Sequence, residues 1–455
     1  MIISEIRYDQ YEEAKRLDAE YYLPEYIEVE NLLKNLRLKL TLLEEVTNFI
    51  KKGIFYILAE EYKKEGIPFI RVSNIRPILL DYRDLVFISE EKNKKEKKTS
   101  LTAGDIVISK SGTLGNVSII PPDMPICNIS QDVIGISVKK KEINPYYLAL
   151  FLNSPYGQTQ LLRGKSQAVQ GHLTLEFVRK IKVPLPSYDF QQTIESIVKE
   201  AYQKRNEANT KYKEAKKLLN RILGLEELRI TKPKTFEVKF NDVEPILRFD
   251  AEHYQPKYRQ VKEFLRRSRY QVKRLREVIE ISNKKTDPSQ EPTKYFNYIE
   301  LANINPSTGE IEEYSQIIGH KAPSRARMVV KSGDVLVASL SGSLDNVGLI
   351  PIELDGAIAS TGFFVIRSKN FLSEFLFLLF RTDLIKLQLE EKTAGAIMSA
   401  VPKTTFGDIL IPLVPIEKQN PIANLINESF KLHKEARELL NKAKKEVEDF
   451  IEKGS

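Results

Sequence analysis

The stretch Arg16-Leu17-Asp18-Ala19-Glu20-Tyr21-Tyr22 returns 232 positions later as Arg248-Phe249-Asp250-Ala251-Glu252-His253-Tyr254. The similarity continues downstream at a nearly constant offset: Gly104-Asp105-Ile106-Val107 matches Gly333-Asp334-Val335-Leu336, and Val183-Pro184-Leu185 matches Ile411-Pro412-Leu413. Solenoid units are far shorter, at roughly 20–50 residues. The chain therefore contains a duplicated domain, and a duplicated domain suits a target with two halves.

The composition is typical of a soluble protein with a polyanionic partner. The chain has 455 residues, a hydrophobic content of 42% and a net charge of +8, and nucleic acid is the commonest polyanion in the cytoplasm. No run of 18 apolar residues predicts a membrane span, and the first residues lack the layout of a signal peptide. The single cysteine, Cys127, excludes internal disulfides and a multi-thiolate metal site. We expect a cytoplasmic protein with no membrane partner and no small-molecule substrate.

Two segments, 190–224 and 418–455, carry heptad patterns typical of a coiled coil. The first seam consists of Ile194, Ile197, Ala201, Arg205, Ala208, Tyr212, Ala215, Leu219 and Ile222. The second consists of Ile422, Leu425, Ser429, His433, Ala436, Leu440, Ala443, Val447 and Phe450. Because a whole domain separates them, we expect antiparallel pairing with a pseudo-two-fold axis and a globular copy at each end. Arg205 and His433 interrupt the seams at the same heptad position; they either fix the register or extend into solvent.

Each copy shows mixed helical and strand patterns, which predict an α+β fold with tandem domains. Helices are expected at 25–38, 146–153, 257–267 and 373–390. Strands are expected at 69–72, 105–108, 117–120 and 133–136, and at 298–301, 334–338, 347–350 and 363–366. The predicted division is 1–187 for the first copy, 188–231 for the central helix and linker, 232–415 for the second copy, and 416–455 for the C-terminal helix.

Residues with a catalytic or metal-binding pattern are missing from the sequence. The four histidines, His172, His253, His320 and His433, have no metal-ligand spacing. Gly112-Thr113-Leu114-Gly115 lacks the lysine of a phosphate-binding loop and is better read as a turn between strands. The acidic pairs Asp18/Glu20 and Asp250/Glu252 precede predicted helices, whose N-terminal ends they would stabilise. Glu237-Val238-Lys239 resembles half of a nuclease motif but is expected to be a strand. These patterns indicate a binding subunit without catalytic or metal residues.

Candidate DNA contacts lie in the loops between the predicted elements, except Arg71, which lies in the expected strand 69–72. Lys51-Lys52 and Lys284-Lys285 occupy corresponding loops and would bind phosphates. Cations and amides that could read base edges follow at Arg163, Lys165, Gln167, Gln170 and His172, with the counterparts Lys392, Ser399 and Lys403. Further candidates are Arg71, Asn74, Lys110, Ser111, Thr113 and Asn116 in the first copy, and Asn303, Ser341, Ser343 and Asn346 in the second. A solvated lysine-rich loop is the alternative for each basic cluster. The framework positions match between the copies and the polar loops do not, so the copies would read two different short sequences.

The layout resembles the specificity subunit of a type I restriction-modification system. The resemblance rests on the Arg-Leu/Phe-Asp-Ala-Glu-x-Tyr start of each copy, the Gly-Asp segment followed by Ser-Gly and Asn-Val, the Val/Ile-Pro-Leu end, and the glutamines Gln191-Gln192 and Gln419 that lead into each long segment. The second copy departs from the first at two places. Its segment Gly395-Ala396-Ile397-Met398 lacks the glutamine that the first copy has at Gln170, and Asp345 replaces Gly115.

The resemblance implies two target-recognition domains that bind the halves of an asymmetric split site on double-stranded DNA. The helices would measure the unread spacer and dock methyltransferase subunits, two being expected, and restriction subunits would join through them. S-adenosylmethionine, ATP and magnesium would belong to those partner subunits, and no cofactor is expected in this chain. Two alternatives remain: an orphan DNA-binding protein without catalytic partners, and a protein-interaction scaffold that uses the coiled coil. The missing catalytic motifs argue against a self-contained methyltransferase-nuclease.

Overall fold

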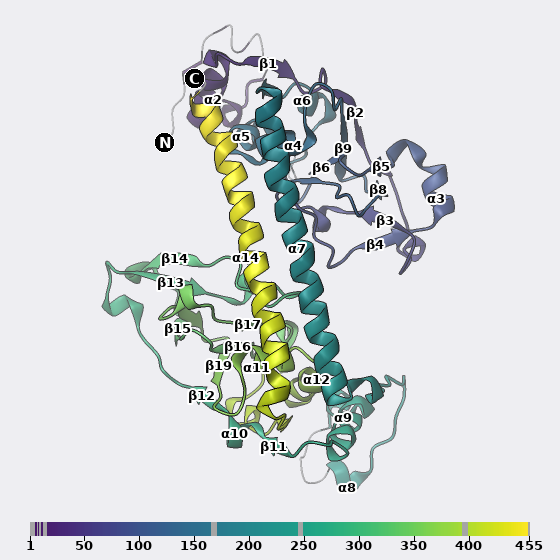
Figure 1. Cartoon of the computed structure of the whole chain (residues 1–455), viewed down its shortest axis with the longest axis vertical. Helices are drawn as coiled ribbons and strands as arrows, with labels where there is room; N and C mark the ends of the chain where they lie inside the picture. Colours follow the sequence, from purple (N-terminus) through teal and green to yellow (C-terminus); the bar gives the residue numbers. More distant parts are fainter. Residues whose placement is uncertain are drawn as a thin grey trace. The chain divides into compact units, whose positions relative to one another are not determined.

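The computed structural model describes residues 5, 6, 8, 11, 16–164, 171–243, 249–393 and 399–453. The chain divides into two compact units (Figure 1). Unit 1 comprises Met1–Lys204 and Glu435–Ser455, and unit 2 comprises Arg205–Lys434. Each unit therefore contains one copy of the repeat together with one part of each long helix.

In its described residues, unit 1 contains two four-stranded sheets and a two-stranded ribbon. The first sheet is antiparallel and has the order β2 (Thr47–Lys52), β9 (Val133–Val138), β6 (Ile106–Ser109), β7 (Val117–Ile119). The second has the order β4 (Val86–Ile88), β3 (Ile67–Ile70), β8 (Ile126–Ile129), β5 (Leu101–Thr102). Its central strands β3 and β8 run parallel. The ribbon pairs β1 (Lys39–Leu42) with β10 (Lys182–Leu185).

The helices of unit 1 pack on the first sheet and on the ribbon. They are α2 (Pro24–Asn35), α4 (Pro145–Asn153), α5 (Pro155–Arg163) and α6 (Leu175–Arg179), with α3 (Glu90–Lys95) beside the second sheet. A proline opens α2, α4 and α5, where its missing N–H costs no hydrogen bond. The largest core of unit 1 combines these helices with apolar residues of β2, β6, β7 and β9.

Unit 2 repeats this topology strand for strand. Its first sheet has the order β12 (Glu280–Ser282), β19 (Phe363–Arg367), β16 (Val335–Ala338), β17 (Val347–Leu349). Its second has the order β14 (Ser315–Ile318), β13 (Tyr295–Ile299), β18 (Ile358–Ser360), β15 (Ala326–Val329), with β13 and β18 parallel. The ribbon pairs β11 (Val272–Arg274) with β20 (Leu410–Pro412). The helices are α8 (Phe240–Val243), α9 (Pro256–Arg266), α10 (Leu275–Val278), α11 (Ser373–Phe380), α12 (Asp383–Lys392) and α13 (Lys403–Phe406). The predicted α+β fold with tandem domains is confirmed.

The repeated Gly-Asp pair forms the same turn in both units. Gly104 and Gly333 have φ angles of 89° and 82°, a region that glycine enters without steric cost. The carboxylates of Asp105 and Asp334 then accept hydrogen bonds from the backbone N–H of Thr102 and Lys331, at 2.8 and 2.9 Å. The motif therefore shapes the entry into the central strands β6 and β16.

The long helices are α7 (Tyr188–Leu223) and α14 (Ile416–Lys453), teal and yellow in Figure 1. In unit 1, Phe190 stacks on Phe450 with ring centroids 4.5 Å apart, and Lys204 pairs with Glu435 at 2.6 Å. In unit 2, the Ser429 hydroxyl donates to the Ala208 carbonyl at 2.8 Å, and Lys211 pairs with Glu428 at the same distance. Within each unit, residues that come later in α7 contact residues that come earlier in α14. The expected antiparallel pairing is confirmed.

The predicted seam is buried along most of both helices. Ile194, Leu219, Ile422 and Val447 are buried, as are the small residues Ala201, Ala208, Ala215, Ala436 and Ala443. Tyr212 and Leu440 are partly buried against the cores. Near the helix ends, Val198, Leu223, Ile426 and Ile451 are more deeply buried than the predicted Ile197, Ile222, Leu425 and Phe450. Each helix packs on the body of its unit as well as on the other helix, and this second contact widens the apolar face beyond a strict heptad seam.

A buried glutamine fixes the start of each long helix to the body of its unit. Gln191 accepts a hydrogen bond from the Asn144 backbone N–H at 2.7 Å and donates to the Pro186 carbonyl at 3.1 Å. Gln419 accepts from the Leu372 N–H and donates to the Val414 carbonyl, both at 2.8 Å. These glutamines belong to the lead-in noted in the sequence, so that motif is structural.

Two predictions for local structure are wrong. The expected helix 373–390 is divided into α11 and α12, because Arg381 and Thr382 turn the chain and the Arg381 guanidinium donates to the carbonyls of Pro306 and Ser307. The expected strand 237–239 is an exposed loop before α8. No strand among the described residues lies beside this segment to satisfy its backbone groups, so its β-branched residue is not sufficient to form a strand.

Candidate nucleic-acid interface

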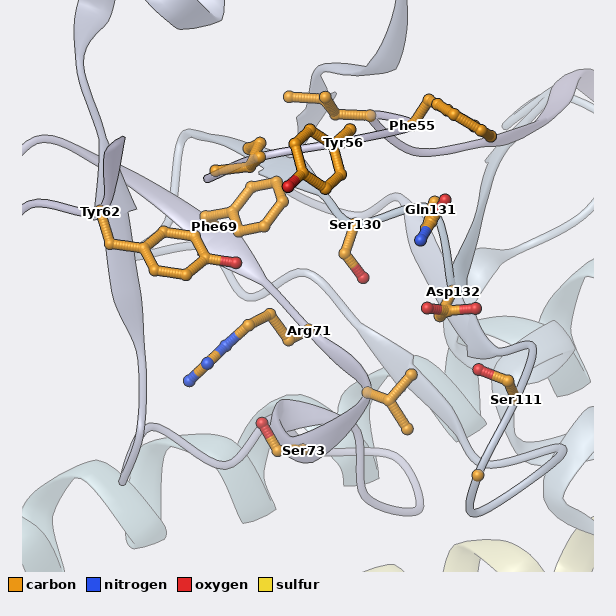
Figure 2. A pocket seen from close by; sticks show the side chains of 14 residues that line it. Phe55, Tyr56, Tyr62, Phe69, Arg71, Ser73, Ser111, Ser130, Gln131 and Asp132 are labelled. Atoms are coloured by element: carbon orange, nitrogen blue, oxygen red, sulfur yellow. The ribbon is translucent and has the colours of Figure 1, made fainter. Parts of the chain in front are cut away.

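A cavity of about 460 Å³ opens on unit 1 where four connecting segments meet. The segment after β2, the 3-10 turn η3 (Val72–Asn74), the β6–β7 turn and the β8–β9 turn form its walls. Figure 2 shows aromatic side chains on one side of this cavity and Ser111, Gln131 and Asp132 on another. Loops carried by sheet ends commonly hold binding residues, because the sheets position them rigidly.

The aromatic wall is unusually open to solvent. Phe55 is 82% exposed and Tyr56 is 67% exposed, whereas Tyr62 contacts the buried Phe69 with ring centroids 5.9 Å apart. Exposed aromatic rings on a basic protein can contact bases or the methyl group of thymine. Phe55 and Tyr56 therefore extend the candidate interface with apolar contacts.

Arg71 supplies the cation of the cavity. The strand expected at 69–72 ends at Ile70, so Arg71 lies at the start of the η3 turn. Its Nη2 atom donates to the Asp84 carbonyl, and its Cζ atom lies 5.7 Å from the centre of the Tyr62 ring. Nε is buried without a hydrogen-bond partner in the described residues. The hydrogen bond from Nη2 to the Asp84 carbonyl thus fixes the orientation of the guanidinium. The N–H groups of Nη1 form no hydrogen bond within the described chain.

The asparagines among the candidates hold the framework. Asn74 is 1% exposed; its side chain accepts from the Arg71 N–H at 3.0 Å and donates to the Asp81 carbonyl at 3.0 Å. In unit 2, Asn303 accepts from the Glu300 N–H at 2.7 Å in the turn η8 (Leu301–Asn303). The expectation that Asn74 contacts DNA directly conflicts with this burial, because its amide is used inside the domain.

The β6–β7 turn and its counterpart are tied to these 3-10 turns. Asn116 donates to the Ile75 carbonyl at 3.3 Å, and Asn346 donates to the Leu301 carbonyl at 3.1 Å. The tips are more open: Thr113 and Ser341 are exposed, and Ser111, Lys110 and Ser343 are partly exposed. Ser111 lines the cavity. The serine and threonine side chains are therefore the accessible part of each turn, and the asparagines position it.

The predicted lysine pairs differ in accessibility. Lys52, Lys284 and Lys285 are exposed. Lys51 is half-buried; its Nζ atom lies 3.6 Å from the centre of the Phe49 ring and 3.5 Å from the Ser100 carbonyl oxygen. Burial lowers the pKa of the Lys51 ammonium, and the nearby charge of Asp105 opposes that shift. The structure therefore favours Lys52, Lys284 and Lys285 as phosphate contacts over the half-buried Lys51.

Arg163 is also directed inward. Its Nη1 atom lies 2.6 Å from a carboxylate oxygen of Glu30, its Nε donates to the Tyr21 carbonyl at 2.9 Å, and its Cζ lies 4.1 Å from the centre of the Tyr21 ring. The expectation that it reads a base conflicts with this arrangement, because the guanidinium joins α5 to α2 and to the start of the repeat. His172 is partly buried and is not part of the cavity. Lys165, Gln167 and Gln170 lie outside the described residues.

The candidates near the end of the second copy are dispersed. The Ser399 carbonyl accepts from the Ser341 N–H at 2.9 Å, which brings that segment to the β16–β17 turn. Lys403 is exposed at the start of α13. Lys392 is partly buried at the end of α12, where burial lowers the pKa of its ammonium. Met398 lies outside the described residues. The backbone hydrogen bond therefore brings Ser341 and Ser399 together.

Four residues of interest were missed by the sequence reasoning: Phe55, Tyr56, Gln131 and Glu300. Gln131 is exposed at the tip of the β8–β9 turn, and its counterpart after β18, Thr361, is also exposed. Aligning Arg71-Val72-Ser73-Asn74 with Glu300-Leu301-Ala302-Asn303 would have found Glu300. No sequence signal distinguishes the exposed Phe55 from a core residue.

No group of three potential metal ligands occurs in the described residues, and none of their helices combines the length and apolarity needed to span a bilayer.

The family described as "Type I restriction modification DNA specificity domain" matches the chain twice, at residues 39–217 and 267–448. The chain belongs to this family. Both matches include one repeat with its sheets and part of a long helix.

Relatives in this specificity family come from archaea and bacteria. The chain is 23% identical over 426 residues to a putative type I restriction enzyme specificity subunit (MjaX) of Methanocaldococcus jannaschii, covering 90% of this chain and 91% of that protein. It is 33% identical over 131 residues to the EcoBI specificity subunit of Escherichia coli, covering 29% of this chain and 27% of that protein. A crystal structure of a type I restriction-modification S subunit from M. genitalium aligns over 92% of this chain and 96% of that one, with 11% identity and a TM-score of 0.49.

Proposed function

We propose that the chain recognises a bipartite DNA sequence, with one recognition domain at 1–187 and another at 232–415. The observation that carries this proposal is a matched framework with unmatched side chains at its surface. Asn74 and Asn303 hold equivalent turns, as do Asn116 and Asn346. The exposed residues on those frameworks differ: Ser73 faces solvent where unit 2 has Ala302, and Gln131 where it has Thr361. Two scaffolds of one geometry with different polar surfaces suit two different half-sites.

The long helices would set the distance between the half-sites. Both α7 and α14 contribute residues to unit 1 and to unit 2, and a continuous helix is stiff along its axis. The same helices would offer docking surfaces to methyltransferase subunits, two of them being expected, through which restriction subunits would join. The methyl donor S-adenosylmethionine, ATP and magnesium would act in those subunits. This chain would supply the choice of DNA sequence.

The test is genome-wide mapping of methylated bases in cells with and without this gene. Loss of one bipartite methylated motif in the deletion strain supports the proposal and gives both half-sites and the spacer. An unchanged methylation pattern, together with tight, salt-sensitive binding of the purified chain to one duplex, would indicate an orphan DNA-binding protein. Absence of any duplex preference would indicate the scaffold.

The spacer can be tested separately. Changing the spacer by one base pair moves the half-sites by about 3.4 Å and rotates them by about a tenth of a turn, so it should abolish tight binding. Lengthening α7 and α14 by the same number of residues should shift the preferred spacer. An unchanged preference would contradict the role of the helices in measuring it.

A further inference from the structure

The residue that opens the 3-10 turn has the same backbone geometry in both units but the opposite charge. Arg71 has φ and ψ angles of −112° and 167°, and Glu300 has −116° and 173°. Each donates its backbone N–H to the side chain of an asparagine three residues later, Asn74 or Asn303. Each also follows a strand that runs parallel to its neighbour, β3 beside β8 and β13 beside β18. Position 71 and position 300 are therefore equivalent points on the two frameworks.

The side chains at these points are available for contacts outside the domain. Arg71 lines the cavity of unit 1, with its guanidinium on the Tyr62 side in Figure 2. The Asp84 carbonyl occupies one N–H of Nη2, which leaves the other N–H of Nη2 and those of Nη1. Glu300 is exposed and forms no ion pair with another described residue.

The two functional groups match complementary partners on DNA. A guanidinium can donate two N–H groups to O6 and N7 of guanine, and a carboxylate can accept from the N4 amino group of cytosine. The carboxylate is also repelled by phosphates, so it disfavours duplexes on which it accepts no hydrogen bond. A cation and an anion at one framework position therefore select different bases.

We infer that positions 71 and 300 are equivalent specificity-determining residues: Arg71 reads a guanine in the half-site of unit 1, and Glu300 reads a cytosine in the half-site of unit 2. The inference rests on the proposed DNA recognition and names the base that each framework selects. Asn74 and Asn303 are positioning residues, because they hold the backbone of the reading residue and their side chains are used in doing so.

The experiment uses the full chain as it is purified from cells, with any subunits that accompany it. Each protein selects duplexes from a library of random DNA sequence, and the bound pool is sequenced. Arg71→Gln should reduce the enrichment of guanine about 5- to 150-fold at one position of one half-site and leave the other half-site unchanged. Glu300→Gln should reduce cytosine enrichment in the other half-site alone. Lys94→Gln removes an exposed positive charge from unit 1, which also contains Arg71, and should preserve both consensus half-sites.

The outcomes separate this inference from the proposed function. If the wild type enriches two half-sites and both glutamine variants enrich the same two, DNA recognition stands and the roles of Arg71 and Glu300 are wrong. Changes by both variants in one and the same half-site also overturn the inference. If the wild type enriches no sequence, the proposed function fails and the inference fails with it. If circular dichroism shows that Arg71→Gln does not fold, the DNA pool selected by Glu300→Gln decides the outcome, because Glu300 is exposed.

Discussion

The Nδ1 atom of His433 lies 3.7 Å from the Oε2 atom of Glu310, and both side chains are buried, at 9% and 5% exposed. His433 interrupts the heptad seam of α14, and Glu310 lies between η8 and β14 in the same unit. The polar residue of this seam therefore contacts the body of unit 2. It does not extend into solvent, which was one of the two alternatives drawn from the sequence. Arg205, at the matching position of α7, is half-exposed.

Replacing His433 by Ala should destabilise unit 2. The substitution takes an imidazole away from a buried carboxylate and leaves unfilled volume, and we expect this loss to cost about 2 kcal/mol. Urea unfolding followed by circular dichroism measures the change. Lys434→Ala is the matched control, since Lys434 pairs with Glu353 on the surface and should cost less than about 1 kcal/mol. Equal effects of the two variants would show that the buried pair is not stabilising.

Arg163 should act in stability and not in sequence preference. Its guanidinium bonds to Glu30 and to the Tyr21 carbonyl, and hydrogen bonds to charged groups contribute about 1.5–3 kcal/mol. Arg163→Gln should therefore lower the urea midpoint of unfolding by an amount equivalent to about 2 kcal/mol, while the selected DNA consensus stays unchanged. If Arg163→Gln changed the selected DNA consensus and kept the stability of the wild type, Arg163 would be a base-reading residue after all.

The same pair predicts an acid-sensitive contribution. Burial raises the pKa of Glu30, but hydrogen bonds and charges from Arg163 and Lys34 outweigh it and lower the pKa to about 2. Because the folded pKa lies below the ordinary value of 4.5, the stabilisation is present above about pH 4.5 and is lost as the pH falls toward 2. Urea midpoints at about pH 6 and about pH 3 should differ more for the wild type than for Arg163→Gln. A difference of the same size in both proteins would refute this linkage.

The exposed lysines should contribute to binding through phosphate contacts. Replacing Lys284 and Lys285 together by Ala should weaken binding to all duplexes alike and reduce the slope of log affinity against log salt by about 2. Titrations of one duplex at several salt concentrations measure that slope. Lys51→Ala is the control, because the half-buried Lys51 ammonium lies over the Phe49 ring, and its slope should equal that of the wild type. A lower slope for Lys51→Ala would show that Lys51 reaches the DNA.

Gly53 should tolerate no side chain. A Cβ atom there would lie 2.0 Å from the Ile129 carbonyl oxygen and 2.3 Å from that of Ser130, so the segment after β2 would have to move away from the end of β8 and the β8–β9 turn. We expect Gly53→Ala to cost about 3 kcal/mol. Gly342→Ala provides the comparison, as no atom lies within 4 Å of its Cβ position. Thermal unfolding of both variants measures the difference, and similar melting temperatures would contradict the close approach at Gly53.

Much of the fold could be predicted from the sequence because its signals are periodic or repeated. The heptad spacing identifies the buried face of α7 and α14, and β-branched runs such as 133–136 coincide with strands. The division of 373–390 into two helices could not be predicted, because it depends on hydrogen bonds from Arg381 to carbonyls about 75 residues away. Local pattern contains no information on such partners.

By itself, the sequence determined the duplicated α+β architecture, the paired helices and the matched framework with its unmatched loops, since these follow from composition, spacing and comparison of the two copies. The tertiary structure decided which polar side chains remain available to a ligand. Arg163, Asn74 and Lys51 are used inside unit 1, whereas Arg71 lines a cavity and Phe55 is exposed. A cation or an amide has the same chemistry in either place, and only the groups that surround it in three dimensions determine whether it stabilises the domain or contacts DNA.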